Sequence, residues 1–205
     1  MSEADTRTLI LDAAQDLIQR LGANAMSYQH LSEAVGIRKA SIHYHFPAKQ
    51  DLLEALIERY HAYFLGLVDR IVGEESDPAR MLDRYVGLFE ATLREGKHDK
   101  ACLCGMLGAE LASLGDEAVR GIRRFYQANQ ERLAAILQQG RDAGVFGFAG
   151  DPAVLAGLIF AALEGAILVV RAEGGREAFP GPGGRAAPAP RRVTFSIPSY
   201  LPTRR

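Results

Sequence analysis

Apolar residues recur every three or four positions along most of the first 172 residues of this 205-residue chain. This spacing places apolar side chains on one face of an α-helix, so it predicts an all-α protein with a substantial core. Six of the nine prolines lie instead in residues 174–205, where they disfavour helices and central strands. The pattern therefore predicts a helical body that ends near residue 173, followed by an extended or mobile tail.

Turn and capping residues divide the body into segments. Gly22 follows the first apolar stripe, Ser27 stands at an N-cap position, and Gly36 interrupts the next stripe. Two Asp-Pro pairs, at 77–78 and 151–152, combine an N-cap with a residue suited to the first helical turn. Helices are predicted at about 6–21 (capped by Asp5 or Thr6), 28–35, 39–45, 48–71, 78–93, 102–114, 116–141 and 152–172.

The most informative segment is 27–49, where two short predicted helices flank Gly36 and share a small core that includes Leu31, Ala34 and Ile42. This spacing is typical of a helix-turn-helix, whose second helix lies in the DNA major groove. The side chains that face outward on the second helix suit phosphates and base edges: Arg38, Lys39, Ala40, Ser41, His43, Tyr44 and His45. A helical hairpin with a solvated polar face has the same pattern, so the spacing alone leaves both interpretations open.

The first 70 or so residues resemble the DNA-binding domain of TetR-type transcriptional regulators. The resemblance rests on the run 13–22, on Ser27, and on the segment 36–53 with its His45-Phe46-Pro47. It implies an all-α homodimer with an N-terminal three-helix DNA-binding domain (1–50), a C-terminal effector-binding and dimerisation domain (51–173, with 51–72 as connector) and a tail (174–205). It also implies a cytoplasmic repressor that a small-molecule effector releases from a pseudo-palindromic double-stranded DNA operator.

The same resemblance assigns roles within the DNA-binding domain. Lys39, Ala40 and Tyr44 correspond to base contacts, while the candidate phosphate contacts and their neighbours are Ser27, Tyr28, Gln29, His43, His45 and Lys49. Two residues depart from the family pattern. Arg38 replaces a small hydroxyl residue, so the recognition helix either starts loosely or gains a DNA contact. His43 replaces a tyrosine, which would make a phosphate contact partly dependent on pH.

The C-terminal part contains aromatic and polar residues among aliphatic ones, as an effector pocket requires. The candidates are Phe64, Tyr85, Phe89, Cys102, Glu110, Phe125, Tyr126, Asn129, Phe160 and Glu164. The aromatic residues fit a plain core as well as a pocket. The polar residues Glu110, Asn129 and Glu164 fit a helix surface or a subunit interface as well.

Cys102 and Cys104 support an alternative, in which the protein is a thiol-based sensor of electrophiles or oxidants. The segment around them resembles one subgroup of the family, whose sensing cysteine corresponds to Cys102. A helix N-terminus and the nearby Lys97, His98 and Lys100 would lower the pKa of that thiol. The spacing of His98, Cys102 and Cys104 does not suit a tetrahedral metal site, so no metal and no cofactor is predicted.

Charge and composition exclude several classes of protein. The chain shows no signal peptide, no motif of a catalytic site and no run of the ~20 apolar residues that a membrane helix needs. Its formal net charge of -1 combines a body of net -6 with a tail of net +5, and three of the five basic residues in 1–50 lie within 38–49. This placement predicts DNA binding that weakens sharply with salt.

Two questions remain open at the level of sequence. A helical interaction module that has lost DNA binding is a further alternative, which the departures at Arg38 and His43 favour. Members of the family commonly have another helix where this chain has its Pro-rich tail, so 174–205 is either a native basic tail or the product of a frame change. Dimerisation is predicted to rest on the helices at 116–141 and 151–172.

Overall fold

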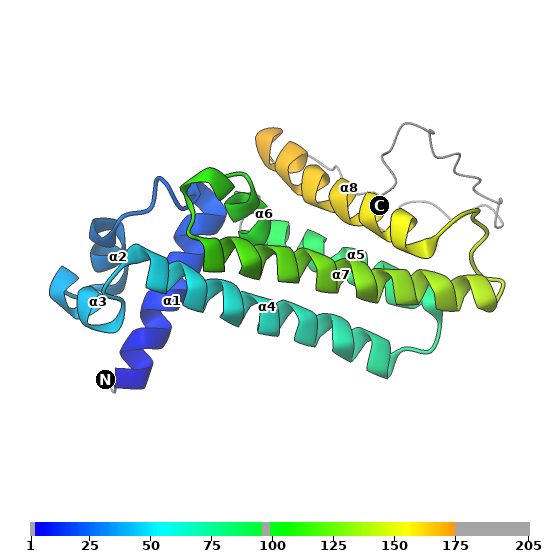
Figure 1. The fold of residues 1–205 in the computed structure, drawn as a ribbon, viewed down its shortest axis with the longest axis horizontal. Coiled ribbons are helices and arrows are strands. Elements are labelled where there is room, and N and C mark those ends of the chain that lie inside the picture. Colours follow the sequence, from blue (N-terminus) through cyan, green and yellow to red (C-terminus); the bar gives the residue numbers. More distant parts are fainter. Residues whose placement is uncertain (1–2, 96–98, 175–205) are drawn as a thin grey trace.

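The computed structural model describes residues 3–95 and 99–174, which form an all-α fold (Figure 1). The elements are α1 (Glu3–Leu21), α2 (Tyr28–Val35), α3 (Lys39–His45), α4 (Lys49–Glu74), α5 (Pro78–Glu95), α6 (Leu103–Gly108), a turn of 3-10 helix (Leu111–Ser113), α7 (Asp116–Asp142) and α8 (Pro152–Ala172). The predictions for the tail beyond Gly174 and for Lys97 and His98 lie outside the described residues.

Local signals in the sequence account for most of these helix ends. The Ser27 hydroxyl accepts a hydrogen bond from the His30 amide at 3.3 Å, which caps α2. Gly36 ends α2 in the left-handed conformation, with φ of 74°. Asp151 caps α8 by accepting from the Ala153 amide at 2.8 Å. Arg38 makes no side-chain cap at α3, as its chemistry predicts.

The helices form two packed groups that share α4 and α6. Helices α1–α3 gather at one end of the molecule, and α4 runs from them along its length beside α5 and α7 (Figure 1). Helix α8 packs against α7 and α5. The short α6 contacts α1, α4 and α7, so it lies between the N-terminal helices and the C-terminal bundle.

Three predictions about local structure are wrong. Helix α1 begins at Glu3, so Asp5 and Thr6 lie inside its first turns rather than capping it. The helix predicted at 102–114 divides into α6 and the 3-10 turn, because Gly105 and Gly108 weaken a helix at that point. Ala34 is exposed, so it does not form the contact between α2 and α3.

Helix α8 also departs from the expectation that no segment is apolar enough to cross a membrane. It is 21 residues long with a mean hydropathy of 2.5 in its most apolar window, so by length and composition alone it could cross a membrane. One face packs on α7 and α5 through Ala156, Phe160, Leu163 and Ile167. The opposite face exposes Val154, Leu158, Leu168 and Val169.

Candidate functional site

Helix α3 presents the side chains that the sequence predicts to contact DNA. Lys39, Ala40, His43 and Tyr44 are exposed, and Tyr44 has 70% of its surface accessible. Ile42 lies on the opposite face and is fully buried. Arg38 is exposed before the helix, while Ser41 and His45 are partly covered. The helix is therefore anchored by its apolar side and offers cationic and aromatic groups on the other.

Residues of α2 fix the end of α3. The Tyr28 hydroxyl donates to the Phe46 carbonyl at 2.9 Å, and burial raises the pKa of Tyr28 to about 12. The Tyr28 ring lies 4.7 Å from the His43 ring, whose Nδ1 donates to the Pro47 carbonyl at 3.3 Å. Gln29 is exposed and bonds to Glu33. Tyr28 therefore serves the packing of the domain, while Ser27, besides capping α2, stays exposed beside Gln29.

The Lys49 ammonium, predicted to contact a phosphate, makes hydrogen bonds within the protein. It donates to the carbonyls of Ala23 and Met26, at 2.8 Å in the second case. Burial lowers the pKa of Lys49, and the charge of Glu110 opposes that effect. These contacts use the ammonium to close the loop between α1 and α2, and the role of Lys49 as a phosphate contact stays a prediction.

A closed circuit of six aromatic rings lies at the centre of the C-terminal bundle. Successive centroids are 5.5–6.2 Å apart, in the order Tyr60, Phe64, Phe89, Phe160, Tyr126 and Phe125. Tyr85 joins through Phe89, and its hydroxyl donates to Asn129 at 3.4 Å. The structure thus brings the predicted aromatic residues together. The prediction omitted Tyr60, although its four-residue spacing from Phe64 places both on one face of α4.

Glu164 places a carboxyl beside this circuit, one helical turn after Phe160. Burial raises its pKa to about 7, and the Cys102 thiol hydrogen-bonds to it. Its Oε1 is buried without a hydrogen-bond partner among the described residues. Gly105 lets the carboxyl approach the backbone of α6, because a Cβ there would collide with Oε2. Gly108 does the same for the Tyr126 hydroxyl, which donates to the Cys104 carbonyl at 2.7 Å.

The predicted activation of Cys102 is wrong. Its side chain is buried, and burial together with the nearby Glu164 charge raises the pKa of the thiol. Lys100 does not act on it as expected, because its ammonium pairs with Asp16 at 2.6 Å. The Tyr60 hydroxyl lies 3.7 Å from the sulfur. A buried, protonated thiol is a poor nucleophile, so the structure argues against a thiol-based sensor.

The sequence makes Glu110 a candidate for the effector pocket, but its side chain does not reach the aromatic circuit. Its carboxylate accepts hydrogen bonds from the Ala23 amide at 2.7 Å and the Asn24 amide at 3.2 Å. Near it, the Gln19 amide donates to the Ala101 carbonyl and the Ala101 amide donates to the Gln19 carbonyl, both at 3.0 Å. These bonds tie the end of α1 to the segment around α6.

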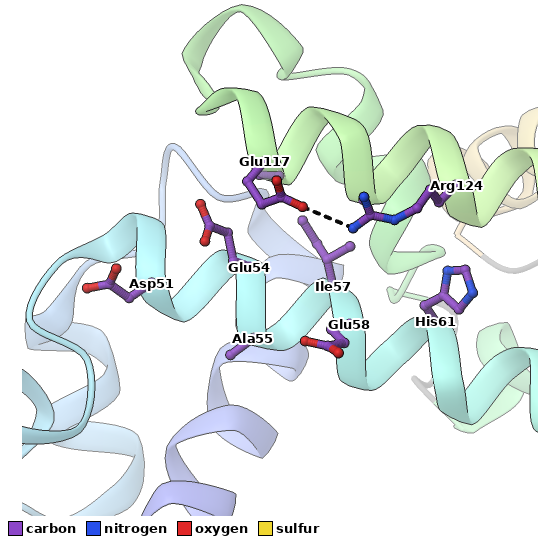
Figure 2. A pocket seen from close by; sticks show the side chains of 10 residues that line it. Asp51, Glu54, Ala55, Ile57, Glu58, His61, Glu117 and Arg124 are labelled. Atoms are coloured by element: carbon purple, nitrogen blue, oxygen red, sulfur yellow. Dashed lines mark hydrogen bonds and ion pairs between the residues drawn. The ribbon is translucent and has the colours of Figure 1, made fainter.

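The surface formed by the described residues includes two grooves. One, of about 630 Å³, runs between α4 and α7, where Asp51, Glu54, Glu58 and Glu117 give it acidic walls and Arg124 pairs with Glu117 at 3.1 Å (Figure 2). None of the predicted effector residues lines it. The second, of about 820 Å³, is lined by residues of α7 and by Ala153, and it includes Tyr126 of the circuit.

Comparison with known proteins gives consistent matches over both parts of the chain. Residues 10–56 match the family model of bacterial regulatory proteins of the tetR family, and residues 78–180 match the tetracyclin repressor-like C-terminal domain. The transcriptional regulator AcuR of Cereibacter sphaeroides is 26% identical, with coverage of 80% of this chain and 75% of AcuR. The HTH-type transcriptional repressor NemR of Escherichia coli is 24% identical, with coverage of 82% and 84%.

The likeness extends to three dimensions. A solved TetR-family transcriptional regulator from Agrobacterium tumefaciens superposes with a TM-score of 0.81 at 32% identity, and the match covers 84% of this chain and 90% of that one. The helices described above therefore follow an arrangement already seen by experiment in a relative.

Proposed function

Because this chain belongs to the TetR family, whose members are transcriptional regulators rather than enzymes, we propose that it is a cytoplasmic, homodimeric repressor. It binds a pseudo-palindromic operator through α3 and leaves the operator when a small molecule occupies the C-terminal bundle. The observation that carries this proposal is the exposed face of α3, where Lys39, His43 and Tyr44 extend from a helix anchored by buried Ile42.

The proposal assigns phosphates and base edges to different parts of that face. Lys39 and Tyr44 reach into the major groove, where a cationic and a hydroxyl-bearing side chain can hydrogen-bond to base edges. His43 already donates from Nδ1 to Pro47, so its Nε2 can donate to a phosphate only when the ring carries both protons. Arg38 makes no cap at the start of α3, and its charge is available to the backbone of the operator.

Dimerisation is proposed to cover the outer face of α8. Along this face the large exposed side chains of Val154, Leu158, Leu168 and Val169 flank small ones, namely exposed Ala161, Ala162 and Gly165. Small residues let a second helix approach closely, and contiguous apolar surface of this kind is typical of protein interfaces. Two α3 helices in such a dimer must lie about 34–36 Å apart, or a multiple of this, to read two half-sites.

Helix α6 is proposed to carry the signal between the two sites. On one side it meets the Glu164 carboxyl and the Tyr126 hydroxyl at Gly105 and Gly108. The segment on its other side holds the end of α1 through Glu110. A ligand that displaces α6 therefore acts on the position of the DNA-binding helices, and it shifts the population away from the spacing that DNA requires.

The test is an electrophoretic mobility shift with the DNA upstream of the chain's own gene, repeated at increasing salt. We expect a sequence-dependent complex whose affinity falls steeply with salt concentration. A genomic DNA library that yields no sequence-dependent, salt-sensitive complex contradicts the proposal. Light scattering at micromolar concentration tests the dimer: Leu168→Lys should give a monomer, whereas Val72→Lys, at an exposed position on α4, should not.

A further inference from the structure

Glu164 is a buried carboxyl that the surrounding residues leave only half satisfied. Within residues 3–95 and 99–174 its Oε1 has no hydrogen-bond partner, although carboxyls are rarely buried unless they are paired. The titratable groups that face it are Tyr60 from α4, Tyr85 from α5, Cys102 and Cys104 at the start of α6, and Tyr126 from α7. None of these groups carries a positive charge, so the partner that an ionised Glu164 requires does not come from them.

The rings around Glu164 suit such a partner. Six aromatic side chains from α4, α5, α7 and α8 make the closed circuit described above, and Phe160 stands one turn before Glu164 on the same helix. The faces of aromatic rings attract cations, and this attraction strengthens where water is excluded. A carboxylate next to several such rings therefore favours a positively charged group that also carries apolar substituents.

We propose that this core binds a small organic cation, an amine or a quaternary ammonium, whose charge pairs with Glu164 and whose alkyl groups pack against the aromatic circuit. The inference rests on the proposed function, because it names the class of effector for that function. An anion is disfavoured beside the carboxylate. A neutral donor satisfies Oε1 but leaves the charge of Glu164 without a counterion, so it binds more weakly.

Tyr126 provides a route into the site. Its ring belongs to the aromatic circuit and also lines the surface groove formed by α7 and Ala153. Its hydroxyl is held by the Cys104 carbonyl at 2.7 Å. Tyr126 therefore lies between the groove and the aromatic circuit, where a ligand that enters from the groove would meet it first.

The test uses isothermal titration calorimetry of the full chain with choline and with 3,3-dimethylbutan-1-ol, which has the same shape without the charge. We expect choline and tetramethylammonium to bind and the neutral isostere to bind at least tenfold more weakly. Glu164→Gln should weaken choline binding by roughly tenfold to hundredfold, the effect of losing a hydrogen bond or pairing with a charged group. Glu173→Gln, at the exposed end of α8, is the matched control and should bind as the wild type does.

The pH dependence gives a second readout that needs no variant. Because burial raises the pKa of Glu164 to about 7, the apparent affinity of the wild type should reach a plateau near pH 8 and be roughly tenfold lower at pH 6, where the carboxyl is mostly protonated. Binding of choline should also release a proton near pH 7.

Several outcomes overturn the inference. If choline, tetramethylammonium and butylamine all fail to bind at millimolar concentration, a cation site is excluded. Equal binding to wild type and Glu164→Gln, or equal binding of choline and its isostere, places any site elsewhere. A wild type that binds operator DNA but no cation refutes this inference alone, whereas one that binds choline through Glu164 but no DNA refutes the proposed function alone.

Discussion

Replacing Glu110 by alanine should destabilise the fold by about 2 kcal/mol, because Glu110 joins the end of α1 to the segment after α6. Its carboxylate accepts from the Ala23 amide at 2.7 Å and the Asn24 amide at 3.2 Å, and its charge acts on Lys49. A hydrogen bond to a charged group contributes about 1.5–3 kcal/mol. Glu110 is partly exposed, so the short bond contributes near the lower limit and the longer one little.

The measurement is thermal unfolding followed by circular dichroism. For a chain of this size about 1 kcal/mol shifts Tm by roughly 2–4 °C, so Glu110→Ala should melt about 4–8 °C below the wild type. Glu110→Gln keeps an acceptor oxygen but loses the charge, and it should fall between the two. Glu95→Ala, at the exposed end of α5, is the control. If Glu110→Ala melts together with Glu95→Ala, the bonds to α1 do not stabilise the fold and the reasoning fails.

Four further outcomes follow from the structure. Gly66→Ala, with open space around it, should gain up to about 1 kcal/mol in urea unfolding, whereas Gly105→Ala should gain less, because its Cβ would displace the Glu164 carboxyl. Arg38→Ala should weaken operator binding and reduce the slope of log affinity against log salt by about one in fluorescence anisotropy, because Arg38 is proposed to contact the operator backbone. Cys102 should not react with Ellman's reagent in the native protein, and rapid labelling would contradict its burial. Without a cation, Glu164→Gln should be about 3 kcal/mol more stable than the wild type at pH 8. The reason is that the pKa of Glu164 rises from 4.5 to about 7 on folding, so ionisation of this carboxyl opposes folding. Denaturant titrations should show this advantage shrinking below about 1 kcal/mol near pH 5, where protonation restores the stability of the wild type.

The helices were predictable from sequence because their ends are set by neighbours a few residues away. Ser27 caps α2 by bonding to His30, and Asp151 caps α8 by bonding to Ala153. Each interaction spans no more than three residues, so local chemistry is sufficient to place it. The buried face of α3 followed in the same way from the helical period around Ile42.

The roles of single charged residues were not predictable, because they depend on partners distant in the chain. Lys49 reaches carbonyls about 25 residues before it, and Glu110 reaches amides 86 and 87 residues before it. A sequence pattern shows the charge of such a residue but not the backbone group that meets it. The reactivity assigned to Cys102 failed for the same reason: the basic residues nearby in sequence suggested a thiolate, while burial and Glu164 act in the opposite direction.

The position of α6 links these long-range contacts into one equilibrium. Gly105 and Gly108 leave no free space between α6 and the side chains of Glu164 and Tyr126, so a cation that draws Glu164 toward itself changes the packing against α6. The segment that includes α6 holds α1 through Ala101 and Glu110, so the same change acts on the helices that bind DNA. Linkage then requires reciprocity: if a cation lowers operator affinity by some factor, saturating operator DNA must lower the affinity for that cation by the same factor. Titrating choline into the protein with and without operator DNA measures this factor, and equal choline affinities in the two titrations would mean that the cation and the DNA do not act through a shared equilibrium.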